Sequence, residues 1–125
     1  MKHIETKQAP QAVGPYSQGV FVKDTLYVSG QIPFVPETMT LVSNDISDQT
    51  RQSLNNILAI VKAAGLQKED IVRCGVFMTD LGEFSKMNAI YAEFFGAHKP
   101  ARAAVEVRRL PKDVLIEIDA IAVKP

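Results

Sequence analysis

Four charged side chains near the C-terminal end of the chain are of the types that bind or react with small polar molecules. They alternate with apolar residues such as Val105 and Ile118, so in extended strands the charges fall on one face and the apolar residues on the core face. A planar guanidinium suits a carboxylate, and a carboxylate side chain can act as a general base. The alternative is a solvated sheet face whose charges only keep the protein in solution. The four residues are Arg102, Glu106, Glu117 and Asp119.

The strands that carry these charges are predicted from their alternating pattern and from the turn sequence LPKD between them. We predict that they pair as a hairpin, which places Glu106 opposite Glu117. On this register Arg102 and Glu117 lie about 13 Å apart, at ~3.3 Å per residue, too far for contact within one chain. They could meet a shared ligand or groups from another subunit. The strands are Ala103 to Arg108 and Val114 to Val123.

Few residues in the sequence are of the types that bind metals or act as strong nucleophiles. His3, Cys74 and His98 are far apart and show no CxxC or HExxH spacing, so we predict no metal site. The single cysteine has no intrachain disulfide partner, and its surroundings IVRCGVFM are typical of a buried strand. Neither GxGxxG nor GxxxxGK(S/T) occurs, so the common phosphate-binding loops are missing.

The composition is that of an ordinary globular chain. With 125 residues, 46% of them hydrophobic, the sequence is long enough for one domain, 1–125, with its own core. Its 14 basic residues balance 14 acidic ones, so we expect no general attraction to nucleic acid or to anionic membranes. No apolar run is long enough to span a membrane and no signal region precedes the chain's first strand, so we expect a cytoplasmic protein.

The rest of the chain supplies the scaffold for the charged strands. Runs rich in β-branched residues predict strands, and apolar residues spaced three and four apart between capping residues predict two helices. The predicted elements are a hairpin of strands 18–23 and 25–32, an irregular loop 33–45, a helix 46–64, a central strand 70–78 and a helix 82–95. The order is β-β-α-β-α-β-β, with room for a short N-terminal strand. This order is typical of an α+β fold in which two helices pack on one face of a single sheet.

The second predicted helix carries a stripe of aromatic side chains and one methionine. Such a stripe at helical spacing is usually core packing rather than a cofactor-binding surface, so we assign it to the core. The stripe consists of Phe84, Met87, Tyr91, Phe94 and Phe95.

Three segments carry a resemblance to a known family. They are HKPARAAVEVRRLPKDVLIEIDAIAV, which contains the charged strands, GPYSQGV from Gly14 to Val20, and YVSGQIP from Tyr27 to Pro33. Together they closely resemble the reactive intermediate deaminase A family, also called RidA, YjgF or the enamine/imine deaminases, over essentially the whole chain. The resemblance implies a chorismate-mutase-like fold and a homotrimer with an inner β-barrel and ligand clefts between subunits. It also implies hydrolysis of 2-imino acids, such as 2-iminobutanoate and 2-iminopropanoate (from 2-aminoacrylate), to 2-keto acids and ammonia without a metal or organic cofactor.

The resemblance also assigns roles to particular residues. The arginine of the family's PAR motif falls on Arg102, which would bind the substrate carboxylate, and its glutamate falls on Glu117, which would hold and polarise the attacking water. Many members have a cysteine at the position of Ala104 and bind the ligand through its backbone, which the alanine keeps. With Arg102 nearby, we expect Glu117 to stay ionised. The other substrate-binding residues that the resemblance implies are Tyr16, Ser29, Gly30, Gln31 and Asn88.

A function of another class stays open at this point. A regulatory trimer could bind 2-keto acids or similar small carboxylates through Arg102 without turning anything over. Relatives have also been connected with ribonuclease action, but the zero net charge and the lack of a basic stripe or a suitable histidine pair argue against RNA as a partner. The decay of 2-iminobutanoate with and without the protein distinguishes the enzyme from the regulator.

Overall fold

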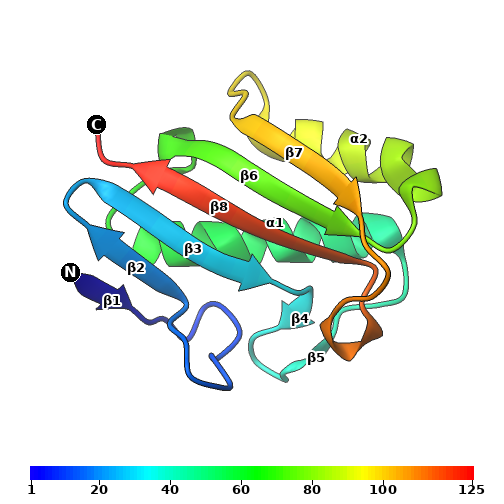
Figure 1. Cartoon of the computed structure of the whole chain (residues 1–125), viewed down its shortest axis with the longest axis horizontal. Coiled ribbons are helices and arrows are strands. Elements are labelled where there is room, and N and C mark those ends of the chain that lie inside the picture. The colour runs from blue at the N-terminus through cyan, green and yellow to red at the C-terminus, as the bar shows by residue number, and fades with distance from the viewer.

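One large sheet with two helices on a single face forms the frame of the protein. The computed structural model describes all 125 residues. The elements are β1 (Lys2–Ile4), β2 (Gly19–Val22), β3 (Thr25–Gln31), β4 (Phe34–Val35), β5 (Thr40–Leu41), α1 (Ile46–Ala63), β6 (Ile71–Met78), α2 (Phe84–Phe95), β7 (Ala101–Glu106) and β8 (Ile116–Val123). Six strands pair in the order β1-β2-β3-β8-β6-β7, and both helices lie against one face, leaving an open face on the other side (Figure 1). The predicted α+β architecture is confirmed.

Both helices end where their sequence signals indicate. Asp45 caps α1, because its carboxylate accepts a hydrogen bond of 2.9 Å from the N–H of Asp48. Gly65 follows α1 with a φ of 83°, and Gly96 follows α2 with a φ of 63°, a backbone region that favours glycine. Helix α2 begins two residues later than predicted, because a 3-10 turn at Leu81–Glu83 precedes it.

The core lies between the helices and the covered face of the sheet. Strand β8 runs through the middle of the sheet and alternates in burial as its sequence predicts. Its core-facing residues meet the fully buried Leu54, Ile57 and Ile60 of α1 in one hydrophobic cluster. Glu117, Asp119 and Ile121 are half-buried on the open face. The core-facing residues of β8 are Ile116, Ile118, Ala120 and Ala122.

The predicted C-terminal hairpin is wrong. Strand β6 lies between β7 and β8, and it pairs in parallel with β7 and antiparallel with β8. Helix α2 is the crossover connection that a parallel pair requires. The LPKD segment does turn, at Pro111–Asp113, but the chain then passes the end of β6 and β8 pairs with β3 as well. Glu117 therefore lies opposite Phe77 instead of Glu106.

The face predicted for the first of these two strands is also wrong. Cross-strand partners share a face of a sheet. Arg102 is the partner of the buried Cys74 and lies on the helix side, whereas Val105 is the partner of Phe77 and lies with Glu117 on the open face. Strand β7 is an edge strand, so its apolar residues do not mark the core: Val105 is 44% exposed. The four charged residues therefore do not converge on one face.

The N-terminal half follows its prediction more closely. Strands β2 and β3 form the expected hairpin, and Lys23 takes up the left-handed conformation (φ 54°) in its turn. The segment 33–45, predicted as an irregular loop, instead contains the two-stranded pair β4 and β5. Asn56 of α1 holds this pair in place, since its amide donates hydrogen bonds to the carbonyls of Ile32 (3.2 Å) and Phe34 (3.0 Å). No helix has the length and apolar character needed to cross a membrane.

Candidate functional site

Arg102 lies on β7 beside helix α2, and neutral groups of that helix contact its guanidinium. Its Nη1 donates a hydrogen bond of 2.8 Å to Oδ1 of Asn88. Its guanidinium carbon lies 4.7 Å from the centre of the Tyr91 ring and 5.5 Å from that of Phe84, distances at which a cation is attracted to an aromatic face. No carboxylate lies within ion-pair distance of Arg102. The positive charge is therefore uncompensated within the chain and can accept an anionic ligand.

A phenol and a thiol lie on the core side of this arginine. Burial raises the pKa of Cys74 to about 11 and raises that of Tyr91 well above its ordinary value. Both groups are neutral at physiological pH, so neither gives Arg102 a counter-charge. The hydroxyl of Tyr91 lies close to the thiol, and after burial this neighbour further raises the pKa of Tyr91. The interpretation of Cys74 as a buried strand residue is confirmed.

Glu117 lies on the open face of β8, over the backbone of Gly30 in β3. A Cβ atom at Gly30 would lie 2.9 Å from the carboxylate carbon of Glu117 and closer still to Oε2, so this approach requires a glycine. Burial, and after it the negative charge of Asp119, raises the pKa of Glu117. Within one chain Arg102 and Glu117 lie on opposite faces of the sheet, so the expectation that Arg102 keeps Glu117 ionised concerns an arginine of another copy and stays a prediction.

Asp119, two residues along β8, is held over a second glycine. Its Oδ1 accepts a hydrogen bond of 2.9 Å from the N–H of Gly75, and a Cβ atom at Gly75 would lie 3.3 Å from the carboxylate carbon. The Nη1 atom of Arg73 lies 3.4 Å from the same Cβ position. Two glycines on the strands that flank β8 thus make room for two neighbouring carboxylates. Because its pKa is raised, the Glu117 carboxyl exchanges its proton closer to neutral pH than an ordinary one.

The predicted residues Ser29, Gly30 and Gln31 form a bulge in β3, where the register with β8 shifts. The hydroxyl of Ser29 donates a hydrogen bond of 2.6 Å to the carbonyl of Ser17. The side chain of Gln31 turns into the core, where it is 6% exposed, and donates to the carbonyl of Ser29 at 3.0 Å. Gly30 therefore lies beside the carboxylate of Glu117. Ser29 is hydrogen-bonded to the loop before β2, and Gln31 is hydrogen-bonded within the bulge.

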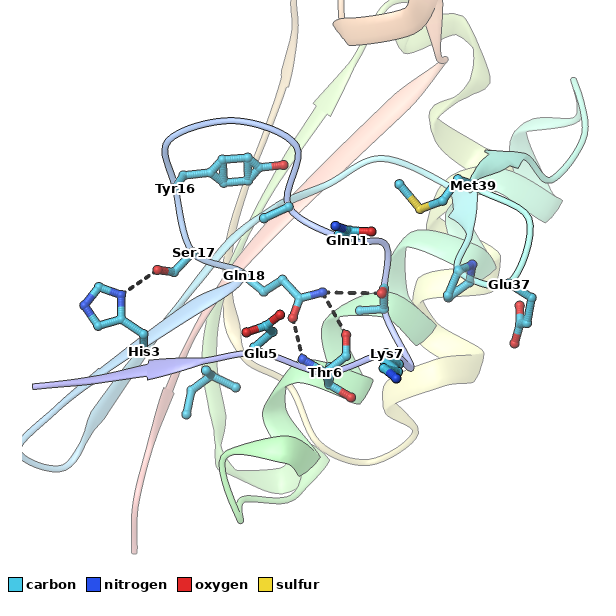
Figure 2. Close-up of a pocket in the computed structure, with 14 residues that line it drawn as sticks. His3, Glu5, Thr6, Lys7, Gln11, Tyr16, Ser17, Gln18, Glu37 and Met39 are labelled. Atoms are coloured by element: carbon cyan, nitrogen blue, oxygen red, sulfur yellow. Dashed lines mark hydrogen bonds between the residues drawn. The ribbon is translucent and has the colours of Figure 1, made fainter.

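Tyr16 lies on that loop, which precedes β2, and lines a cavity of about 650 Å³ (Figure 2). The turn between β4 and β5 contributes Glu37 and Met39 to the opposite wall. Tyr16 is 53% exposed, so the loop presents its ring to solvent or to a ligand rather than to the core.

Gln18 fixes the loop that carries Tyr16. It is 3% exposed, and its side-chain oxygen accepts a hydrogen bond of 2.7 Å from the N–H of Thr6. Its amide nitrogen donates to the carbonyls of Thr6 (3.0 Å) and Pro10 (2.8 Å), and the bonds to Thr6 are visible in Figure 2. This buried glutamine of the GPYSQGV segment is a structural residue that the sequence argument did not single out.

The structure divides the predicted site residues into two groups. Arg102 is level with Ala120 of β8 two strands away, and Glu117 lies three residues further along β8. The Cα atoms of Arg102 and Glu117 are therefore about 14 Å apart, with side chains on opposite faces. One chain does not bring the two groups together. The first group is Arg102, Asn88 and Ala104. The second group is Glu117 and Gly30, and a hydrogen bond from Ser29 connects it to the loop that carries Tyr16.

Sequence reasoning missed the part that the aromatic stripe plays at Arg102. Met87 and Phe95 are buried, as predicted for core residues, but Tyr91 and Phe84 also face the guanidinium. The order strand, helix, strand from β6 to β7 is the signal that could have found this contact, since a crossover helix packs beside the strands it connects. No group of three or more His, Cys, Asp or Glu side chains is arranged to hold a metal ion.

The fold and these two groups define an α+β protein with an uncompensated arginine at a sheet edge and a half-buried carboxylate on the open face. The family model described as endoribonuclease L-PSP matches residues 6–124. The 2-iminobutanoate/2-iminopropanoate deaminase of Salmonella typhimurium is 54% identical over 126 residues, which cover 98% of each chain. Two solved structures, of E. coli TdcF with bound serine (49% identity) and of the E. coli YjgF gene product (52%), match with a TM-score of 0.96 over 100% of both chains. The chain belongs to the YjgF/RidA family, as its sequence motifs predict.

Proposed function

We propose that this chain is a 2-imino acid deaminase, which hydrolyses reactive imines such as 2-iminobutanoate and 2-iminopropanoate to 2-keto acids and ammonia. The observation that carries the proposal is the uncompensated Arg102, held by one neutral amide and two aromatic rings. The relative from Salmonella typhimurium is named for this activity, and the structure of E. coli TdcF contains bound serine, whose carboxylate is of the kind that Arg102 would bind.

Arg102 orients the substrate. Asn88 occupies one donor of the guanidinium, and the remaining N–H groups pair with the two oxygens of the substrate carboxylate. Ala104 lies on the same face two residues further on, in an edge strand whose backbone can bind the ligand beside the arginine. This pairing fixes C2 of the imine relative to the protein, which is the main requirement when the electrophile is already reactive.

Glu117 activates water. The water oxygen adds to C2 of the protonated imine while the Glu117 carboxylate accepts a proton from it. The resulting carbinolamine receives that proton on nitrogen. Its hydroxyl proton then passes back to the Glu117 carboxylate as the C–O double bond forms and the C–N bond breaks, and the 2-keto acid and ammonia leave, with this last proton released as ammonium. A raised pKa makes Glu117 both a stronger base in the first step and a protonated donor for the second. Gly30 lets the carboxylate approach the strand closely and fixes its position.

The complete site lies between copies of the chain in a homotrimer whose open faces turn inward as a β-barrel. Arg102 of one copy and Glu117 of another line the same cleft, which the separation of the two groups within one chain supports. The open face also exposes large apolar side chains that a second copy would cover. They are Tyr27 (52% exposed), Val105 (44%) and Val123 (37%). Sedimentation of the pure protein tests the assembly, with three times the mass of one chain expected and a stable monomer contradicting it.

The activity is tested by making 2-iminobutanoate in place. A threonine dehydratase releases the imine, semicarbazide competes for it, and the appearance of 2-ketobutyrate is followed. The protein should speed ketone formation, and Arg102→Ala should lose nearly all of this effect. The matched control is Arg109→Ala, which removes an exposed arginine that already pairs with Asp113 at 3.2 Å and should retain the activity. Binding of 2-ketobutyrate without faster hydrolysis would favour the regulatory trimer instead.

A further inference from the structure

Tyr91 lies where the guanidinium of Arg102 needs support. Its ring centre is 4.7 Å from the guanidinium carbon, closer than that of Phe84 at 5.5 Å. Asn88, three residues earlier on the same side of α2, holds one edge of the guanidinium through its 2.8 Å hydrogen bond. We propose that Tyr91 is a positioning residue, whose ring face holds the Arg102 guanidinium in the orientation that binds the substrate carboxylate. This role rests on the proposed function of Arg102.

The Tyr91 ring is itself buried and packed against other rings, as a positioning surface must be. It is 7% exposed and packs against Phe95 with ring centres 4.8 Å apart and planes tilted by 53°. Phe95 is fixed in turn by edge contacts with Phe94 (4.9 Å) and His98 (5.9 Å). A long arginine side chain on an exposed edge strand would otherwise sample many rotamers, so a rigid ring face reduces the entropy lost on binding a ligand.

An aromatic partner also leaves the arginine free to bind. A carboxylate partner would occupy the N–H donors in the guanidinium plane and cancel its charge, whereas a ring attracts the cation from above the plane and takes no donor. Cys74 and Tyr91, the titratable groups on the core side of Arg102, are neutral, and no carboxylate lies within ion-pair distance. Tyr91 thus holds Arg102 in place without competing with the substrate.

The ring, rather than the hydroxyl, is the part of Tyr91 that performs this role. The buried Oη has no partner other than the nearby thiol of Cys74, which is a weak hydrogen-bonding group, so removing the hydroxyl costs little. Tyr91→Phe keeps the face beneath the guanidinium, and Tyr91→Leu removes it while retaining an apolar side chain. These two variants therefore separate the aromatic face from both the hydroxyl and the general filling of space.

The experiment measures KM for 2-iminobutanoate and the inhibition constant of 2-ketobutyrate in folded variants, checked by circular dichroism and melting temperature. Tyr91→Leu should raise both constants by about 3- to 30-fold, which is the range expected for the loss of one cation–π contact. It should change kcat less than KM. Tyr91→Phe should restore both constants to within about twofold of the original chain. The matched control is Phe21→Leu, because that ring is also partly buried against the core but lies on β2, four strands away from β7; it should leave both constants unchanged.

Wild-type KM and inhibition constants in a folded Tyr91→Leu variant would overturn the proposal, as would an equal rise in Phe21→Leu. If Tyr91→Leu does not fold, Phe84→Leu takes its place, since this ring is only partly buried and also faces the guanidinium. A smaller rise in both constants is then expected, and no rise overturns the proposal. Arg102→Ala separates the two levels: a loss of activity there with an unaffected Tyr91→Leu refutes only the positioning role, whereas a fully active Arg102→Ala refutes the proposed function.

Discussion

Replacing Gly30 by alanine should remove activity while leaving the fold intact. The backbone of Gly30 does not require a positive φ, so an alanine can adopt its conformation. The new Cβ atom, however, would lie 2.9 Å from the carboxylate carbon of Glu117 and 3.3 Å from its Cγ. The obstacle is the end of a flexible side chain rather than backbone, so the clash is relieved when the carboxylate swings away.

The size of the effect follows from that displacement. Ordinary contacts to a Cβ atom begin at 3.4 Å, so the carboxylate must retreat by roughly 1 Å at its tip, and a misplacement of this size can cost about 100-fold in rate. The free energy of unfolding should change by no more than about 1 kcal/mol, because the alanine also restricts the unfolded chain. We therefore expect a fall in kcat/KM near two orders of magnitude with almost no fall in melting temperature.

The matched control makes the same change beside the other carboxylate. Gly75→Ala would press on Asp119, with its Cβ atom 3.3 Å from that carboxylate carbon, but has no direct clash with Glu117. Hydrolysis of 2-iminobutanoate and thermal melting are measured for both variants. Wild-type kcat/KM in Gly30→Ala would refute the reasoning, and so would an equal loss of activity in the two variants.

Three further predictions concern the surroundings of the site. Glu117 must be ionised to accept a proton and its pKa is raised, so kcat/KM should fall in acid at a pH above 4.5, the ordinary pKa of a glutamate. Asp119→Asn removes a negative neighbour of Glu117 and should move this fall to lower pH. An unmoved pH profile would contradict the role of Glu117 as the base. Gln18→Ala should lower the free energy of chemical unfolding by about 1–3 kcal/mol, because it leaves backbone groups of Thr6 and Pro10 without their hydrogen bonds. An unchanged free energy of unfolding would show that these bonds do not stabilise the loop. Cys74, buried and with a pKa of about 11, should react with iodoacetamide at pH 8 only when the chain is unfolded; rapid labelling of the native protein would show that the thiol is accessible.

Local signals were sufficient for much of the fold. The caps at Asp45 and Gly65 and the spacing of apolar residues define α1, and the two-residue connection after Val22 defines the β2–β3 hairpin. The pair β4 and β5 was not predicted, because each strand has only two residues and Asn56, which is far away in the sequence, stabilises the pair. Alternation in the C-terminal strands correctly predicted that they are strands and correctly assigned the faces of β8.

Alternation does not identify the partner of a strand, and this is where the prediction failed. A turn at Pro111–Asp113 is compatible with a hairpin, but β6 occupies the place between β7 and β8. The small apolar residues of β7 then suggested the wrong buried face, because an edge strand leaves Val105 exposed. The motif residues Arg102 and Glu117 could be found from sequence, whereas their separation on opposite faces depends on pairing between distant strands.

The central claim is that each catalytic cleft takes Arg102 from one copy of the chain and Glu117 from another. It is tested most directly by refolding Arg102→Ala and Glu117→Gln together in equal amounts, with different tags that identify mixed trimers. Random assembly leaves about one cleft in four with both intact residues. We expect the two inactive variants together to regain about a quarter of the wild-type rate of 2-iminobutanoate hydrolysis. Mixed trimers without any recovered activity would contradict it.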